Sequence, residues 1–227
     1  MINVYPKSFL EIGCGGGDFL KILENLGWRG CGIDISSKII EVAKKKVNPD
    51  NISIFLSKNI KEKKLRQDLV FALEVLEHIE NDKETLIGWR EYLNGKSKLV
   101  ISVPSHERKW TRHDLLAGHV RRYERDNLIE LFKSAGFIIE KIICYGFPIL
   151  NIMNVIRGVI ARKDPRWHLS RQKRVELSGI NRWKEIGFVR ERLLKLIVVL
   201  FYPVQKLLWR FDIGDGYIIL ASLKKNQ

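Results

Sequence analysis

Cysteine is scarce in this sequence, and so are long apolar runs. Only three cysteines occur among the 227 residues, namely Cys14, Cys31 and Cys144, and their spacing fits no zinc-binding motif. An odd number of cysteines in apolar surroundings excludes a disulfide-stapled secreted domain and indicates reduced core thiols. The N-terminus lacks the basic and then apolar pattern of a signal peptide. No apolar run reaches the roughly 18 to 20 residues that span a bilayer, so we expect a cytoplasmic protein.

Acidic residues are few compared with basic ones. The chain has 40 lysines and arginines against 26 aspartates and glutamates, which gives a formal net charge of +14. This excess indicates a polyanionic partner, either a nucleic acid or an anionic membrane surface. The hydrophobic content of 45% excludes an intrinsically disordered chain, and the length fits one domain with an appended lobe.

The segment 9–20 carries the clearest local pattern. It reads FLEIGCGGGDFL, which is typical of an apolar strand, a glycine-rich turn and the start of a helix. Gly13 permits backbone angles that a side chain would forbid, while Gly15 and Gly17 let a ligand approach the backbone. The helix N-terminus adds unpaired N–H groups and a partial positive charge. These features predict a cradle for a nucleotide-like ligand.

Two acidic residues in this segment argue against a dinucleotide. The fingerprint G-x-G-x-x-G would need a glycine where Asp18 stands, and Glu11 is foreign to it. The pattern E-x-G-x-G-x-G resembles the first motif of the class I S-adenosylmethionine (SAM)-dependent methyltransferases. An acid repels a pyrophosphate but attracts the cationic sulfonium and amine of SAM. The resemblance implies SAM as the cofactor and S-adenosylhomocysteine as its product, held by Glu11, Gly13, Cys14, Gly15 and Gly17.

The next two strand ends add predicted cofactor contacts. The predicted strand 28–35 places Asp34 about 20 residues after the glycines, where an acid accepts hydrogen bonds from the ribose hydroxyls in nucleoside-binding α/β folds. The alternative role is a helix cap, although the following serines can already cap the next helix. Similar methyltransferases bind the adenine amino group with an Asp after the third strand; Asn59 stands here, and its amide oxygen can also accept. The predicted contacts of this part of the site also include Ile35 and Ile60.

The segment 68–79, DLVFALEVLEHI, is the second diagnostic stretch. It resembles the fourth motif of SAM-dependent methyltransferases related to those of ubiquinone and small-molecule O-methylation. The resemblance implies that the backbone of Leu73, Glu74 and Val75 faces the methionine part of SAM. It also implies that Glu77 and His78 lie beside the substrate; the alternative is that this pair caps a helix or is solvated.

The loop after the predicted strand 99–103 is rich in histidine and arginine. In open α/β sheets the ligand lies beyond the carboxyl ends of the strands, so we expect this loop to overhang the pocket. Its His-Asp…Gly-His-x-Arg-Arg-Tyr pattern resembles the substrate-side loop of the same methyltransferases. The candidate catalytic residues are His119 as general base, then His78 and His113, and the candidate substrate-binding residues are Arg121, Arg122 and Tyr123. The alternatives are loop-stabilising roles or a metal site of His106, His113 and His119; we expect no metal.

Alternation of strand and helix patterns predicts the fold class. Helical spacing over 18–26, 38–46, 83–93 and 127–135 alternates with strand-like runs at 28–35, 52–56, 99–103, 137–144 and 216–223. We therefore expect an α/β protein with a Rossmann-like, seven-stranded, mainly parallel sheet. Helices should cover both faces of the sheet, and a helical insertion should precede the last strand.

That insertion predicts a division into two parts. Residues 1–145 and 212–227 form the predicted SAM-binding methyltransferase core, and residues 146–211 form an inserted lobe that is basic and apolar. Its apolar segments, 147–161 and 193–211, alternate with arginines, lysines and tryptophans, which is typical of interfacial membrane helices. Because the first strand begins close to Met1, no N-terminal helical lid is expected, and the lobe could serve as a lid, as a membrane contact or as both.

The sequence therefore predicts a methyltransferase that transfers a methyl group to oxygen of a small-molecule or lipid-linked acceptor. It would be cytoplasmic or peripheral on the inner face of the membrane. One alternative is RNA methylation, which the positive charge favours, although the Asn-Pro-Pro-aromatic signature of adenine amino-methylation is absent. The other alternative is a non-catalytic SAM-binding or membrane-associated interaction protein.

Overall fold

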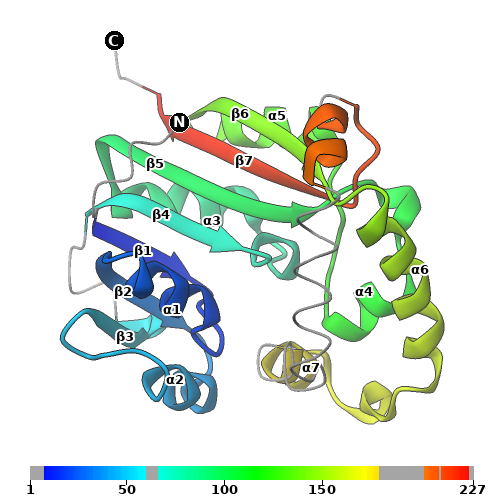
Figure 1. The fold of residues 1–227 in the computed structure, drawn as a ribbon, viewed down its shortest axis with the longest axis horizontal. Coiled ribbons are helices and arrows are strands. Elements are labelled where there is room, and N and C mark those ends of the chain that lie inside the picture. The colour runs from blue at the N-terminus through cyan, green and yellow to red at the C-terminus, as the bar shows by residue number, and fades with distance from the viewer. Residues whose placement is uncertain (1–7, 60–65, 179–201, 210, 225–227) are drawn as a thin grey trace.

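Seven strands form one sheet in the order β3-β2-β1-β4-β5-β7-β6 (Figure 1). The computed structural model describes residues 8–59, 66–178, 202–209 and 211–224. The strands are β1 (Ser8–Ile12), β2 (Arg29–Asp34), β3 (Ile52–Leu56), β4 (Gln67–Leu73), β5 (Leu93–Pro104), β6 (Phe137–Tyr145) and β7 (Gly216–Leu223). Strands β1 to β5 pair in parallel, whereas β7 runs antiparallel to both of its neighbours, β5 and β6. The predicted seven-stranded, mainly parallel sheet is confirmed.

Helices cover both faces of this sheet, as predicted. They are α1 (Asp18–Asn25), α2 (Ser37–Lys44), α3 (Asp82–Trp89), α4 (Arg112–Ala117), α5 (Arg125–Ser134), α6 (Ile149–Ile160) and α7 (Arg171–Ser178). Alternate strand residues face opposite sides: Leu69 and Phe71 of β4 pack in one apolar cluster with α1 and α2. Val70 and Ala72 belong to the other cluster, with α3 and α5. Burial on both faces explains the continuous apolar run of β4.

Two predicted boundaries differ from the structure by more than two residues, and one predicted loop contains a helix. Strand β5 begins at Leu93 rather than at residue 99, because Leu93 pairs with Gln67 across an irregularity in the β4–β5 register. Helix α3 ends earlier than predicted, at Trp89, and a 3-10 turn (Arg90–Tyr92) leads into that strand. The polar segment after β5, predicted as a loop, contains α4, whose N-terminus is closed by a capping box between Thr111 and Asp114.

The β1–α1 turn packs against the end of β4. Gly13 adopts a left-handed conformation with φ 70°, and its N–H and that of Cys14 both donate to Ile33 O, at 2.8 and 2.9 Å. A Cβ atom on Gly13 would lie 2.5 Å from Val75 Cγ2. The glycine therefore serves both the turn geometry and the close approach of two strand ends.

The chain between β6 and β7 carries α6, the 3-10 turn η7 (Pro165–His168), α7 and a helical stretch at 202–208. Both α6 and α7 pack on α4, and Figure 1 shows all three beyond the arrowheads of β4 and β5. The first predicted apolar segment, 147–161, is helical; most of the second, 193–211, lies outside the described residues. Within the described ranges, the helices are too short or too polar to span a bilayer.

Replacement of Gly13 by alanine should destabilise the fold more than replacement of Gly27. Gly27 also has a left-handed φ, of 79°, but a Cβ atom there would meet nothing within 4 Å. Both changes incur the left-handed cost of about 1 to 2 kcal/mol, and only Gly13→Ala adds overpacking of about 1 to 3 kcal/mol. Equal free energies of unfolding for the two variants in a denaturant titration would contradict the packing of Gly13 on Val75.

Candidate functional site

Two buried carboxylates lie at the carboxyl ends of β1 and β2. Glu11 and Asp34 are 4% and 9% exposed. One oxygen of Asp34 accepts from the backbone N–H of Gly15 at 3.0 Å, and the other accepts from the N–H of Ser36 at 3.0 Å. Asp34 therefore fixes the glycine turn, and a carboxylate has further lone pairs for other donors. The predicted capping role belongs to Ser36, whose hydroxyl accepts from the N–H of Ile39.

The electrostatic field of this sheet edge is negative. Burial raises the pKa of the Cys14 thiol, and the charges of Glu11 and Asp34 raise it further. A cationic ligand is favoured in such a place and a pyrophosphate is not. Such a field fits the cationic sulfonium and amine of SAM.

An exposed apolar side chain follows the second carboxylate. Ile35 is 66% exposed, although it directly follows the buried strand β2, and it offers an apolar surface for a nucleobase. Asn59 ends the 3-10 turn η1 (Ser57–Asn59) after β3, and Ile60 lies outside the described residues. Ile35 directly follows Asp34, whose carboxylate accepts from the N–H of Gly15, so it lies next to the residue that fixes the glycine turn.

The end of β4 has an unusual backbone conformation. Glu74 has a positive φ of 56°, and its N–H donates to the backbone oxygen and the hydroxyl of Ser102, at 3.0 and 3.1 Å. Its carboxylate accepts from the Ser102 hydroxyl at 2.8 Å and from the Tyr145 hydroxyl at 3.3 Å. Such strain persists where surrounding contacts enforce it, often at functional sites. The chain turns here so that Leu73 ends the strand and Val75 meets Gly13.

Two histidines and two carboxylates form a cluster just beyond this turn. The His119 Nδ1 atom lies 3.1 Å from Asp114 Oδ1, while His119 Nε2 and His78 Nε2 each lie 3.9 Å from Glu77 Oε1. The two imidazole rings meet edge to face, with their centroids 4.9 Å apart. The structure therefore brings together the first two predicted bases, His119 and His78.

Asp114 is the residue of this cluster that the sequence did not single out. It is fully buried, and it accepts from the backbone of Thr111, from His119 and from the guanidinium of Arg122. Burial would raise the pKa of Asp114, but the hydrogen bond from His119 and the charge of Arg122 hold that pKa well below its ordinary value. Asp114 is thus ionised, and the Nδ1 proton of His119 points toward it. Its sequence signals were the His-Asp motif, which gave Asp114 no role of its own, and the Thr-x-x-Asp pattern of a capping box.

His113 adjoins Asp114 in the chain but is not grouped with Glu77, His78 and His119. Burial is the main cause that lowers the pKa of His113 to about 4, and the charge of Arg157 on α6 contributes in the same direction. His113 is therefore neutral near pH 7. The alternative metal site of His106, His113 and His119 is not formed among the described residues. His106 lies near Cys144 and Asp212, and His119 lies near Glu77 and His78.

The three predicted substrate-binding residues already have partners within the protein. Arg121 pairs with Asp82. Arg122, only 3% exposed in its side chain, pairs with both Asp114 and Asp215, at 2.9 and 3.0 Å. The hydroxyl of Tyr123 donates to Asp82 at 3.1 Å. These three residues also line a pocket of about 240 Å³ together with Asp82, Glu107, Glu124, Asn127 and Leu131.

The helix α7 reaches over the histidine cluster. Arg171 donates to the backbone oxygens of His78 and Gly118, at 2.7 and 3.1 Å, and pairs with Glu80. A Cβ atom on Gly118 would lie 2.4 Å from Val175 of the same helix. The inserted segment is thus in direct contact with both halves of the cluster. A lid was one role offered for this segment from the sequence, but no pattern indicated the contacts of Arg171.

Comparison with known proteins agrees with the geometry. A family described as a methyltransferase domain matches residues 2–142, which is more than half of the chain. The mitochondrial ubiquinone biosynthesis O-methyltransferase of Schizosaccharomyces pombe is 30% identical over 161 residues, which cover 62% of this chain and 59% of that protein. The chain therefore spans little more than half of that relative.

Solved structures share the fold at low identity. A SAM-dependent methyltransferase from Mesorhizobium loti superposes with a TM-score of 0.59 at 13% identity, covering 98% of this chain and 93% of that chain. The magnesium protoporphyrin IX methyltransferase of Synechocystis, solved with bound S-adenosylhomocysteine, has a TM-score of 0.50 at 18% identity, covering 62% and 68%. The family match agrees with the order of the strands and with the acidic residues around the glycine turn. The chain therefore belongs to the class I SAM-dependent methyltransferases, and SAM is its cofactor.

Proposed function

We propose that this methyltransferase methylates a hydroxyl oxygen of a small or lipid-linked acceptor. The observation that carries the proposal is the buried Asp114–His119 pair and its position close to the glycine turn. Gly13 packs on Val75, and the backbone oxygen of Val75 accepts from the N–H of His78 at 3.1 Å. Few contacts thus separate the proposed base from the proposed methyl donor site. The Schizosaccharomyces pombe relative, an O-methyltransferase by name, supports oxygen as the acceptor atom.

The donor side of the site would be formed by the ends of β1, β2, β3 and β4. Asp34 would accept from the ribose hydroxyls, and Glu11 would lie near the cationic groups of SAM. The backbone of Leu73, Glu74 and Val75 would face the methionine part, with Asn59 and Ile60 near the adenine. Bound SAM supplies an electrophilic methyl group. The protein contributes position and orientation, which can supply several kcal/mol of the barrier.

His119 would act as the general base. Because its Nδ1–H donates to ionised Asp114, the lone pair of the neutral ring lies on Nε2, which faces Glu77 and His78. An acceptor hydroxyl bound there would transfer its proton to Nε2 as the methyl group leaves the donor. Asp114 would orient the ring and stabilise the imidazolium, as a buried aspartate does in hydrolytic triads. His78, on the other side of Glu77, is the second candidate base.

The other predicted site residues receive different roles in this proposal. His113 is neutral and partly buried, and it is not grouped with Glu77, His78 and His119, so we assign it to the packing between α4 and α6. The guanidinium of Arg122 is occupied by Asp114 and Asp215, so it would position the base rather than bind an acceptor. Arg121 and Tyr123 would hold Asp82 at the start of α3.

The inserted lobe, 146–211, would cover the acceptor. Arg171 joins α7 to the backbone on both sides of the cluster, as a lid must. The core, 1–145 and 212–227, would bind the donor. This division assigns the donor to one part of the chain and acceptor access to the other.

The outward face of α6 supports a lipid environment for the acceptor. This helix packs inward through Asn154 and Gly158, whereas a surface helix normally buries its apolar stripe. Its apolar side chains point outward and are 50 to 65% exposed, namely Ile152, Val155, Ile156, Val159 and Ile160. The basic residues Arg157, Arg162 and Lys163 are exposed beside them. Apolar and basic groups side by side fit an anionic membrane surface.

One experiment separates this proposal from its rivals. The full chain is incubated with cell-extract fractions and SAM labelled in its methyl group, and lipid, small-molecule and RNA products are separated. We expect label in a lipid or small-molecule ether. Label in RNA, with a salt-sensitive shift on bulk RNA, would support RNA methylation, and the absence of any product would support a SAM-binding interaction protein.

Asp34→Ala should weaken SAM binding by about 10- to 100-fold. The change removes a charged acceptor of ribose hydroxyls, each such bond being worth about 1.5 to 3 kcal/mol, and releases the N–H of Gly15. Calorimetry measures the affinity, with the exposed Asp50→Ala as the matched control. An affinity equal to that of the control variant would remove Asp34 from the cofactor site.

His119→Ala should lower turnover by about 100-fold or more, the usual contribution of a general base, while the SAM affinity stays within about twofold. Turnover is measured as methyl incorporation into the productive extract fraction. His168→Ala, which changes an exposed histidine of η7, serves as the control. If both variants turn over like the wild type, His119 is not the base.

The double variant Ile156→Glu/Val159→Glu should lose binding to anionic vesicles by about tenfold or more. Burial of one such side chain stabilises by roughly 1.5 to 3 kcal/mol, and the new charges oppose the anionic surface. Co-sedimentation with phosphatidylglycerol vesicles measures the effect. The matched control Ile22→Glu/Leu26→Glu changes residues of similar exposure, 56% and 57%, around α1. Equal sedimentation of the two variants would contradict a docking role for α6.

A further inference from the structure

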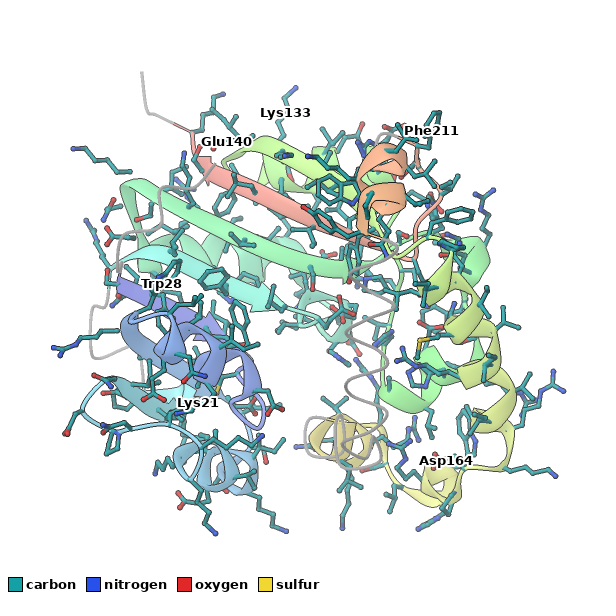
Figure 2. The ribbon with its side chains drawn as sticks, in the orientation of Figure 1. Lys21, Trp28, Lys133, Glu140, Asp164 and Phe211 are labelled. Atoms are coloured by element: carbon teal, nitrogen blue, oxygen red, sulfur yellow. The ribbon has the colours of Figure 1, made fainter. Side chains whose placement is uncertain are left out.

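A second cluster of metal-ligand residue types lies outside the proposed transfer site. His106 follows β5, Cys144 belongs to β6, and Asp212 precedes β7. His106 Nε2 lies 4.0 Å from Cys144 Sγ and 3.8 Å from Asp212 Oδ1, and the three ligand atoms all lie within 4.8 Å of one another. Figure 2 labels Phe211, the neighbour of Asp212, beside the short helix that contains residues 202–208.

Each of the three side chains is oriented by another group. Glu124 Oε2 lies 3.2 Å from His106 Nδ1, so the ring proton belongs on Nδ1 and the Nε2 lone pair points toward the cysteine and the aspartate. The N–H of Gly214 donates to Cys144 Sγ at 3.1 Å. The hydroxyl of Tyr217 lies 2.7 and 2.9 Å from the two Asp212 oxygens. In metal sites, a histidine ligand usually donates its other ring N–H to a carboxylate, and anionic ligands accept hydrogen bonds from neighbouring donors. Both arrangements are present here.

The backbone of His106 has a strained conformation that neighbouring hydrogen bonds hold in place. His106 has a positive φ of 60°, a conformation that costs a non-glycine residue of order 1 to 3 kcal/mol. Its N–H donates to the backbone oxygen of Tyr123 at 2.9 Å. On the opposite side, Lys109 Nζ donates to the backbone oxygens of Ile213 and Gly214. Both loops are therefore held in place so that His106 faces Cys144 and Asp212.

We propose that His106 Nε2, Cys144 Sγ and Asp212 Oδ1 bind a zinc ion. A tetrahedral zinc with these ligands would place the atoms about 3.3 to 3.5 Å apart, so the two separations from His106 Nε2, of 4.0 and 3.8 Å, need to shrink by only about half an ångström. Nitrogen, thiolate and carboxylate together favour zinc over hard cations such as magnesium. As the Zn–S bond forms, the thiol proton of Cys144 passes to solvent.

The role that follows from the geometry is structural. The Asp212 side chain is 38% exposed, so water can occupy the fourth position. The three ligands lie on the segment after β5, on β6 and on the segment that returns from the insertion to β7. A zinc ion there would fasten the returning chain to the sheet, and zinc should raise the melting temperature of the protein.

Cobalt titration tests the proposal. The full chain, stripped of metal with a chelator, is titrated with Co²⁺, and the near-ultraviolet thiolate-to-cobalt absorption is recorded; zinc should then abolish that absorption. We expect one equivalent of cobalt to saturate the band. Cys144→Ser should abolish the band, and Asp212→Asn should weaken cobalt binding about tenfold or more. Cys31→Ser, which changes a buried thiol of β2, should leave the band unchanged.

Three results would overturn the assignment. They are no thiolate band in the wild type, an undiminished band in Cys144→Ser, or equal cobalt affinity in Asp212→Asn and the wild type. Asp212→Asn alters a half-exposed side chain, so it decides the question if Cys144→Ser does not fold. Cobalt bound at Glu77, His78 and His119 would give no thiolate band, because that cluster has no sulfur.

Discussion

The buried carboxylate of Asp114 holds together the chain between β5 and α5. It accepts hydrogen bonds from Thr111 at the start of α4, from His119 and from Arg122. Arg122 in turn donates to Asp215 and to the backbone oxygen of Ser105. Asp215 directly precedes β7, so this one network joins the proposed base to the last strand of the sheet. Buried charges are tolerated only when all of them are paired, and loss of any member would leave the others uncompensated.

The fold could be predicted from the sequence because its signals are local. Glycine at residue 13 and the alternation of apolar runs report directly on a left-handed turn and on strands buried on both faces. The early start of β5 gave no such signal, because residues 94–97 read NGKS and have no partner in the register between the pairs Gln67–Leu93 and Leu69–Lys98. Helix α4 was also missed, because it is short and lies in a polar segment, where a capping box is the main sequence cue.

The candidate site could be predicted only where it follows the strand ends. The residues of the glycine turn and of the β4 end are close in sequence to the strands that place them. His119 was predicted from its residue type and motif, but its contact with Asp114 was not, and Arg122 was predicted at the acceptor although its side chain is buried and paired with carboxylates. Contacts such as Arg171 with His78, or Cys144 with Asp212, join residues 68 or more positions apart. No spacing rule reaches that far.

The pairing of β6 with β7 has a consequence for how such enzymes diversify. Tyr145 and Gly216 face each other in the register, and the N–H of Asp215 donates to the backbone oxygen of Tyr145 at 2.8 Å. The insertion, residues 146–215, thus begins and ends at one residue pair of the sheet, Tyr145 and Gly216. A short hairpin, or a lobe of another shape, could replace it between these two residues without a shift in the register of β6 and β7. Under the division proposed above, the range of acceptors could therefore change by exchange of this one insertion while the SAM-binding core stays the same.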